Sequence, residues 1–167
     1  MRVLGIDCGS EITGYGVVDQ APDRSLHCIA AGAIRLSTKE PLPRRLTRVF
    51  EALSEVLKQH APDSVAIEDV FYAANAKSAL KLGHVRGVAM LAAATYNLQV
   101  AEYAPLAIKS SVVGYGRAEK SQVQQMVTHL LRLQAPPEPF DVSDALAIAI
   151  CHLHTAATLL QQKAAAQ

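Results

Sequence analysis

The sequence predicts an α/β domain in which a mixed five-stranded sheet is flanked by helices. Three strand-like segments follow one another over residues 2–36 with short links, which is typical of an antiparallel meander. Helical and strand-like segments then alternate, as in βα units whose strands run parallel in a sheet. No internal repeat and no long linker divides the 167 residues, so we expect one domain over 1–167 with a frayed tail at 161–167.

The first strand is predicted at residues 2–7, a nearly uninterrupted apolar run that fits a central strand covered on both faces. A turn with glycine and serine leads to a second strand at 13–18. A proline–aspartate break then precedes the third strand at 26–36.

An amphipathic helix is predicted at 41–60, because its apolar residues recur at steps of three and four. Pro62 marks the break after this helix. The remaining predicted elements are a strand at 64–70, a helix at about 75–97, a strand at 98–103, a helix from Pro105, a helix at 118–133 and a last helix from Asp141 to about Leu160.

Composition excludes several classes of protein. Half of the residues are hydrophobic and 19% are charged, as in an ordinary globular protein. No stretch reaches the roughly 18 apolar residues of a membrane span, and charge interrupts the N-terminus too soon for a signal peptide, so we expect a cytoplasmic protein. A net charge of +1 argues against a strongly basic protein that coats nucleic acid. The three cysteines and six histidines show no zinc-site spacing.

Four acidic residues stand where apolar elements begin or end: Asp7, Glu68, Asp141 and Asp144. Each alone has an ordinary explanation as a turn residue, a strand end, a helix cap or a first-turn acid. Together they indicate more, because strands one and four are plausible neighbours and the last two acids share one helix face. Carboxylates gathered in this way are costly unless a cation lies between them, and the usual one is a hard divalent ion with oxygen ligands. The leading interpretation is therefore metal-dependent phosphodiester cleavage.

Basic residues cluster in two segments near these acids. Residues 71–125 contain six basic and two acidic residues, which leaves a charge of +4. A second cluster consists of Arg35, Lys39, Arg44, Arg45 and Arg48. Solvated helix faces would explain either cluster alone, but their position favours a surface that follows phosphates.

Six sequence motifs resemble the RuvC family of Holliday-junction resolvases, in the same order along the chain from residue 2 to about 155. They are Gly5-Ile6-Asp7-Cys8-Gly9-Ser10, Thr13-Gly14-Tyr15-Gly16, Ala66-Ile67-Glu68-Asp69-Val70-Phe71, Ser78-Ala79-Leu80-Lys81-Leu82-Gly83, Ala118-Glu119-Lys120-Ser121-Gln122-Val123 and Asp144-Ala145-Leu146-Ala147-Ile148-Ala149. The resemblance implies a ribonuclease H-like fold, a homodimer and magnesium-dependent nicking of two like-polarity strands at a four-way DNA junction. It also implies partnership with the branch-migration proteins RuvA and RuvB.

The resemblance also assigns candidate residues. The four acids match the family's catalytic carboxylates, Lys109 and Lys120 match basic residues near the scissile phosphate, and Phe71 matches an aromatic residue at the junction. The sequence departs from the family at Cys8, where proline is usual, which raises the question of oxidation beside the metal site. Asp69 and Tyr72 stand where the family varies, so the preferred cleavage sequence stays open.

From charge alone, we expect two Mg²⁺ ions, for which Mn²⁺ could substitute, to activate water and stabilise the leaving 3′ oxygen. Asp7 would bridge both ions, Glu68 and Asp144 would hold one each, and Asp141 would complete the set. Lys120 would neutralise charge at the phosphate. The products would carry 5′ phosphate and 3′ hydroxyl ends. The expected contacts with DNA phosphates are Lys77, Lys81, Arg86 and Lys109, while Phe71 would stack on opened bases or else be a core residue.

Two other classes fit less well. The Asp7-x-Gly9-Ser10 loop also resembles phosphate loops of actin-like sugar kinases, but those enzymes need a second such domain. A non-catalytic junction-binding protein would not need acids at all four positions. One further pair, Gly83 and Gly87, lies one helical turn apart, where it would allow close packing inside the fold or a subunit interface.

Overall fold

Five strands form one mixed sheet in the order β3-β2-β1-β4-β5. The computed structural model describes residues 1–69 and 76–165. The first three strands pair antiparallel, and β4 and β5 continue the sheet parallel to β1. The strands are β1 (Arg2–Asp7), β2 (Ile12–Gln20), β3 (Leu26–Arg35), β4 (Ser64–Glu68) and β5 (Val100–Tyr103).

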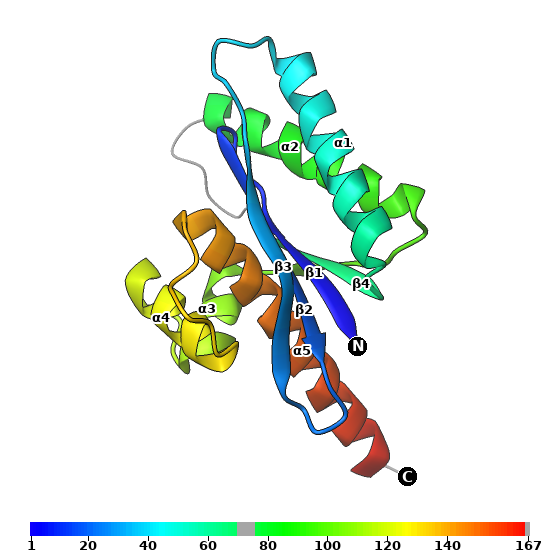
Figure 1. Ribbon diagram of the computed structural model, residues 1–167, viewed down its shortest axis with the longest axis vertical. Coiled ribbons are helices and arrows are strands. Elements are labelled where there is room, and N and C mark those ends of the chain that lie inside the picture. Colours follow the sequence, from blue (N-terminus) through cyan, green and yellow to red (C-terminus); the bar gives the residue numbers. More distant parts are fainter. Residues whose placement is uncertain (70–75, 166–167) are drawn as a thin grey trace.

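Helices cover both faces of this sheet (Figure 1). One layer contains α1 (Leu42–His60) and α2 (Ala76–Thr95), and the other contains α3 (Pro105–Val113), α4 (Lys120–Leu130) and α5 (Phe140–Ala165). Successive residues of β1 point to opposite layers, so Val3 joins the core beneath α5 while Leu4 joins the core beneath α1 and α2. Burial on both faces explains why β1 is apolar almost throughout.

Two glycines let α5 lie directly on the central strands. A Cβ atom added to Gly5 would stand 2.1 Å from the carbonyl oxygen of Ala145, and one added to Gly14 would stand 1.9 Å from that of Asp141. No side chain fits at either position without moving the helix. Gly14 is also the antiparallel partner of Asp7, so this close approach brings the N-terminal turn of α5 over the end of β1.

The predicted fold is confirmed, with changes at the ends of elements. β2 extends beyond its predicted bounds at both ends, and α5 continues to Ala165, past its predicted end. By contrast, α4 is shorter than predicted. It starts after a capping box formed by Glu119 and Gln122, and it ends before Arg132, which has a left-handed φ of 51°. Within the described residues, no helix has the length and apolarity needed to cross a membrane.

Candidate active site

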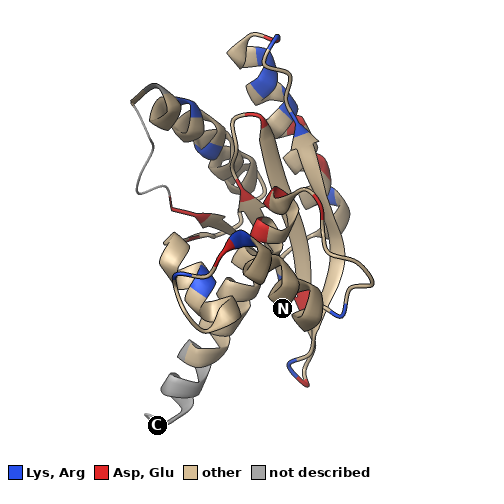
Figure 2. Cartoon of the chain, turned by 90° about the vertical axis from the view of Figure 1, so that its left-hand side faces the viewer, with Lys and Arg blue, Asp and Glu red and all other residues tan. Residues whose placement is uncertain are grey.

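A cleft of about 210 Å³ opens where β1 and β4 end. Its charged lining consists of Asp7, Glu68 and Asp144, with Lys109 and Lys120 beside them. Figure 2 shows acidic segments of separate elements near the middle of this face, with basic segments beside them. The cleft therefore combines carboxylates with the cations that a phosphate group would need.

Parallel pairing of β1 with β4 brings the first two acids together. Ile6 stands opposite Ile67 in the ladder, so the next residue on each strand, Asp7 and Glu68, leaves the sheet at the same edge. The predicted proximity of these two strands is confirmed. The arrangement follows from sequence register, because each acid directly follows a buried apolar run.

The N-terminal part of α5 supplies the other two acids. Asp144 lines the cleft and accepts a hydrogen bond from Lys120 Nζ at 2.7 Å. Asp141 lies one turn earlier and is not among the lining residues, but its charge still acts on Asp7. The three acids other than Asp7 therefore surround it, and one cation already neutralises part of the set.

Among the acids of the cleft, Asp7 has the most strongly shifted pKa. The pKa of Asp7 is raised from 3.8 to about 7, first by burial and then by the negative charges of Asp144, Glu68 and Asp141. Lys120 opposes the rise. Burial and Asp144 also raise the pKa of Glu68, against the charges of Lys120 and Lys109. The cluster is short of positive charge, and a bound cation would relieve this.

The pKa of Lys120 is raised as well, which for a lysine favours the charged form. Burial alone would lower the pKa of Lys120, but its hydrogen bond with Asp144 and the charges of Asp144, Asp7 and Asp141 together raise it. Its side chain nevertheless remains 63% exposed. Lys120 is therefore a charged group that reaches both the acids and the open side of the cleft.

The donor set fits a hard divalent cation, because every acid in the cleft offers carboxylate oxygens and no thiolate or imidazole lines it among the described residues. Among residues 1–69 and 76–165, no three Asp, Glu, His or Cys side chains are grouped closely enough to hold a metal ion as they stand. In this arrangement the ammonium group of Lys120 is paired with Asp144. Metal binding would draw the carboxylates further together.

Cys8 follows Asp7 and is buried. Burial and the adjacent charge of Asp7 raise the pKa of its thiol to about 12. A thiol that stays protonated is a poor nucleophile and a poor target for oxidation. This chemistry argues against the oxidation sensitivity considered from the sequence.

The predicted phosphate contacts fall into different environments. Lys81 is exposed on α2, and Lys109 is half-buried in the cleft. Arg86 is paired inside the molecule, where it contacts Asp69 and Glu102. Phe71, Tyr72 and the side chain of Lys77 lie outside the described part of the structure.

The members of the second basic cluster lie in different environments. Arg45 is buried, with only 7% of its surface exposed. Arg44 and Arg48 line a hollow on α1 together with Glu40 and Glu51, which balance their charges. For Arg44 and Arg48, the interpretation as a solvated helix face therefore fits better than a path for phosphates.

Sequence reasoning missed the hydrogen bonds that join α5 to the parallel part of the sheet. His152 on α5 pairs through one ring nitrogen with the hydroxyl of Ser64, at 3.0 Å, and through the other with that of Tyr103, at 2.9 Å. Burial lowers the pKa of His152, so the ring is held neutral. These bonds tie α5 to β4 and β5, and no local pattern in the sequence signals them.

Comparison with known proteins identifies the family of this chain. The family described as crossover junction endodeoxyribonuclease RuvC matches residues 3–152. A protein of that name from Koribacter versatilis is 64% identical over 166 residues, which cover 99% of this chain and all of the relative. Another from Acidobacterium capsulatum is 58% identical and covers 98% of this chain and 99% of the relative.

Solved structures give the same result. T. thermophilus RuvC in complex with Holliday junction substrate superimposes with a TM-score of 0.87 at 30% identity, covering 95% of this chain and 96% of that one. The yeast mitochondrial Holliday junction resolvase Ydc2 has a TM-score of 0.71 at 14% identity over 95% of this chain and 80% of that one, which shows a shared fold. The ribonuclease H-like fold expected from the motifs is thus confirmed, and the chain belongs to the RuvC family of crossover junction endodeoxyribonucleases.

Proposed function

We propose that this crossover junction endodeoxyribonuclease resolves four-way DNA junctions by paired, magnesium-dependent nicks in two strands of like polarity. The observation that carries the proposal is the cleft in which three carboxylates and two lysines converge at the ends of β1 and β4. The four-way junction is the substrate in the T. thermophilus complex that this chain resembles. Such a substrate would place the protein with the chromosome, in the cytoplasm.

The four acidic residues would have different roles in metal binding. Asp7 lies centrally among the other carboxylates and would hold the metal together with Glu68 and Asp144, with Asp141 completing or orienting the set. When bound, Mg²⁺ or Mn²⁺ would supply an activated water and stabilise the leaving 3′ oxygen, which gives 5′ phosphate and 3′ hydroxyl ends.

Lys120 and Lys109 would act on the substrate phosphate. Both lie in the cleft, and Lys120 remains charged because its acidic neighbours raise its pKa. The ammonium group of Lys120, which is 63% exposed beside Asp144, would offset charge that develops on the phosphate.

A cleavage assay on matched substrates tests the proposed activity. In Mg²⁺, we expect symmetric nicks in a four-way junction and little cutting of duplex DNA of the same sequence. Replacing Mg²⁺ by Ca²⁺ should leave binding intact and slow cutting, because Ca²⁺ accepts a looser coordination geometry. Equal cutting of duplex and junction would contradict the proposal.

An exposed apolar face on α2 supports a homodimer. Leu80 is 65% exposed and Leu91 is 56% exposed, and Gly83 and Gly87 lie between them on the same side of the helix. A Cβ atom on either glycine would meet nothing within 4 Å, so neither glycine serves close packing among the described residues. A second copy of the chain would bury these leucines and bring two clefts to one junction. Contacts with RuvA and RuvB remain an expectation from the family.

Disrupting this face should uncouple the two nicks. We expect the protein to sediment as a dimer at micromolar concentration, and Leu91→Glu to shift it toward monomer because a buried charge at the interface is unfavourable. The variant should then nick one strand at a time. A wild-type monomer that still makes paired nicks would rule out the dimer.

Substitution of two different lysines should affect DNA binding in one case and the cleavage rate in the other. Lys81→Ala removes an exposed cation on α2, and should weaken junction binding and lower its salt slope by about one unit. Lys120→Ala removes a cleft cation and should lower the single-turnover rate at saturating enzyme, with little change in affinity. Binding isotherms over a salt series and single-turnover rates measure both effects. Normal cleavage by bound Lys120→Ala would remove its catalytic role.

A further inference from the structure

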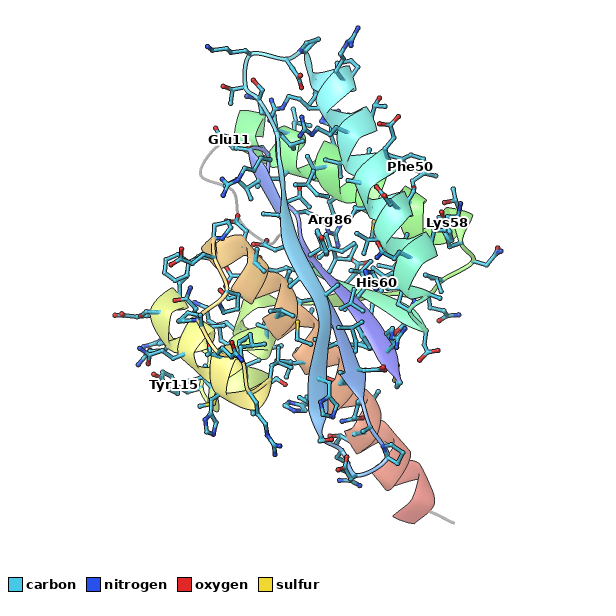
Figure 3. The ribbon with its side chains drawn as sticks, in the orientation of Figure 1. Glu11, Phe50, Lys58, His60, Arg86 and Tyr115 are labelled. Carbon is cyan, nitrogen blue, oxygen red and sulfur yellow. The ribbon has the colours of Figure 1, made fainter. Side chains whose placement is uncertain are left out.

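Arg86 on α2 reaches the point where β4 leaves the sheet. Its Nε donates a hydrogen bond to the backbone carbonyl of Glu68 at 3.4 Å. Its Nη2 pairs with the carboxylate of Asp69 at 3.4 Å and with that of Glu102 on β5. Figure 3 shows Arg86 between α2 and the strands rather than on the outer surface.

We propose that Arg86 is a positioning residue for the metal site, because its guanidinium group holds the end of β4 and thereby sets where the Glu68 carboxylate stands. The proposal rests on the assignment of Glu68 as a metal ligand in the proposed function. It gives Arg86 a role different from the phosphate contact expected from the sequence.

The strand end is held from both sides. Glu68 is the last residue of β4 and stands opposite Tyr103 in the parallel ladder. The next amide, of Asp69, donates to the carbonyl of Tyr103 at 2.8 Å, which fixes the chain toward β5. Arg86 adds a contact from the α2 side to the carbonyl of Glu68 itself. Held in this way, the backbone of Glu68 fixes the point from which its side chain extends, and metal sites depend on such support.

The planar fork of arginine suits this task. Two of the contacts are long and would be weak singly, but one rigid group makes all three, and two of them are to carboxylates. The Arg86 side chain is only 19% exposed, so most of it is unavailable to solvent or to a DNA strand. The cations that lower the pKa of the Glu68 carboxylate are instead Lys120 and Lys109, which line the cleft. Arg86 thus acts on the backbone, while the lysines act on the carboxylate.

Metal affinity measured without DNA tests the proposal. We expect Arg86→Gln to weaken Mn²⁺ binding, followed by electron paramagnetic resonance, by roughly 10-fold, the usual effect of losing an outer partner of a metal ligand. The Mg²⁺ concentration for half-maximal single-turnover cleavage should rise by a similar factor. Junction affinity in Ca²⁺ should stay within about two-fold of wild type, because the lost contacts are internal.

Two further variants separate geometry from charge. Arg86→Lys keeps the charge but loses the fork, so it should behave like Arg86→Gln in Mn²⁺ binding. Lys58→Gln removes one exposed cation from the outer side of α1 and serves as the matched control, with no change expected in metal affinity. If Arg86→Gln fails to fold, Glu102→Gln weakens the same ion pair from β5 and should lower Mn²⁺ affinity about two- to five-fold.

Two results would overturn the proposal. One is unchanged Mn²⁺ affinity in Arg86→Gln, or in Glu102→Gln if the first variant does not fold. The other is normal metal binding with weaker junction binding and a lower salt slope, which would make Arg86 a phosphate contact. Glu68→Gln tests the assignment of Glu68 as a metal ligand separately from the role of Arg86. If this variant binds Mn²⁺ as tightly as wild type, the assignment of Glu68 as a ligand fails, whatever Arg86 does.

Discussion

Asp7→Asn is expected to abolish nicking while junction binding survives or tightens. The amide removes the carboxylate at the centre of the acid cluster, so we expect the single-turnover rate to fall by on the order of 10³-fold or more. Binding should not fall, because a negative charge that repels the DNA phosphates is lost at the same time. Gel-shift and cleavage assays on one four-way junction measure both quantities.

Asp23→Asn is a suitable control for this experiment. It makes the same chemical change at an exposed position between β2 and β3, where Asp23 accepts hydrogen bonds from Ser25. Binding and cleavage should both match wild type. Appreciable magnesium-dependent cleavage by Asp7→Asn would remove Asp7 from the mechanism.

Asp7→Asn should also stabilise the metal-free protein above neutral pH. The pKa of Asp7 is raised to about 7 in the folded protein from 3.8. The folded state therefore binds this proton more tightly than the unfolded state does. The corresponding stability is fully present below about pH 4, and it is lost as the pH rises through about 7. At pH 8 without metal, Asp7→Asn should raise the free energy of unfolding by on the order of 2–4 kcal/mol.

Thermal melts at two pH values measure this effect. In chelator at pH 8, the variant should melt several degrees above wild type, and at pH 4 the two should nearly coincide. Added Mg²⁺ should raise the melting temperature of wild type more than that of the variant, because metal stabilises the state that binds it. A lower melting temperature for Asp7→Asn at pH 8 would mean that the Asp7 carboxylate is not destabilising in the folded protein.

Local patterns in the sequence predicted the elements, the mixed sheet and the approach of Asp7, Glu68 and Asp144 to one cleft. The apolar runs before Asp7 and Glu68 define two strands, and parallel register then places both acids at one edge. The three-residue spacing of Asp141 and Asp144 places both on one helix face. These features follow from strand and helix periodicity, which is a property of neighbouring residues.

Only the tertiary structure decided how each charge is used. Lys120 and Arg86 are both basic residues of the same stretch, yet Lys120 pairs with Asp144 in the cleft and Arg86 supports the backbone of Glu68. Arg45, which looked like a surface cation, is a buried residue of α1. Likewise, the strand periodicity around Gly14 did not show that α5 presses on it. Burial, pairing and pKa depend on distances between segments far apart in the chain, and these distances exist only once the layers have packed.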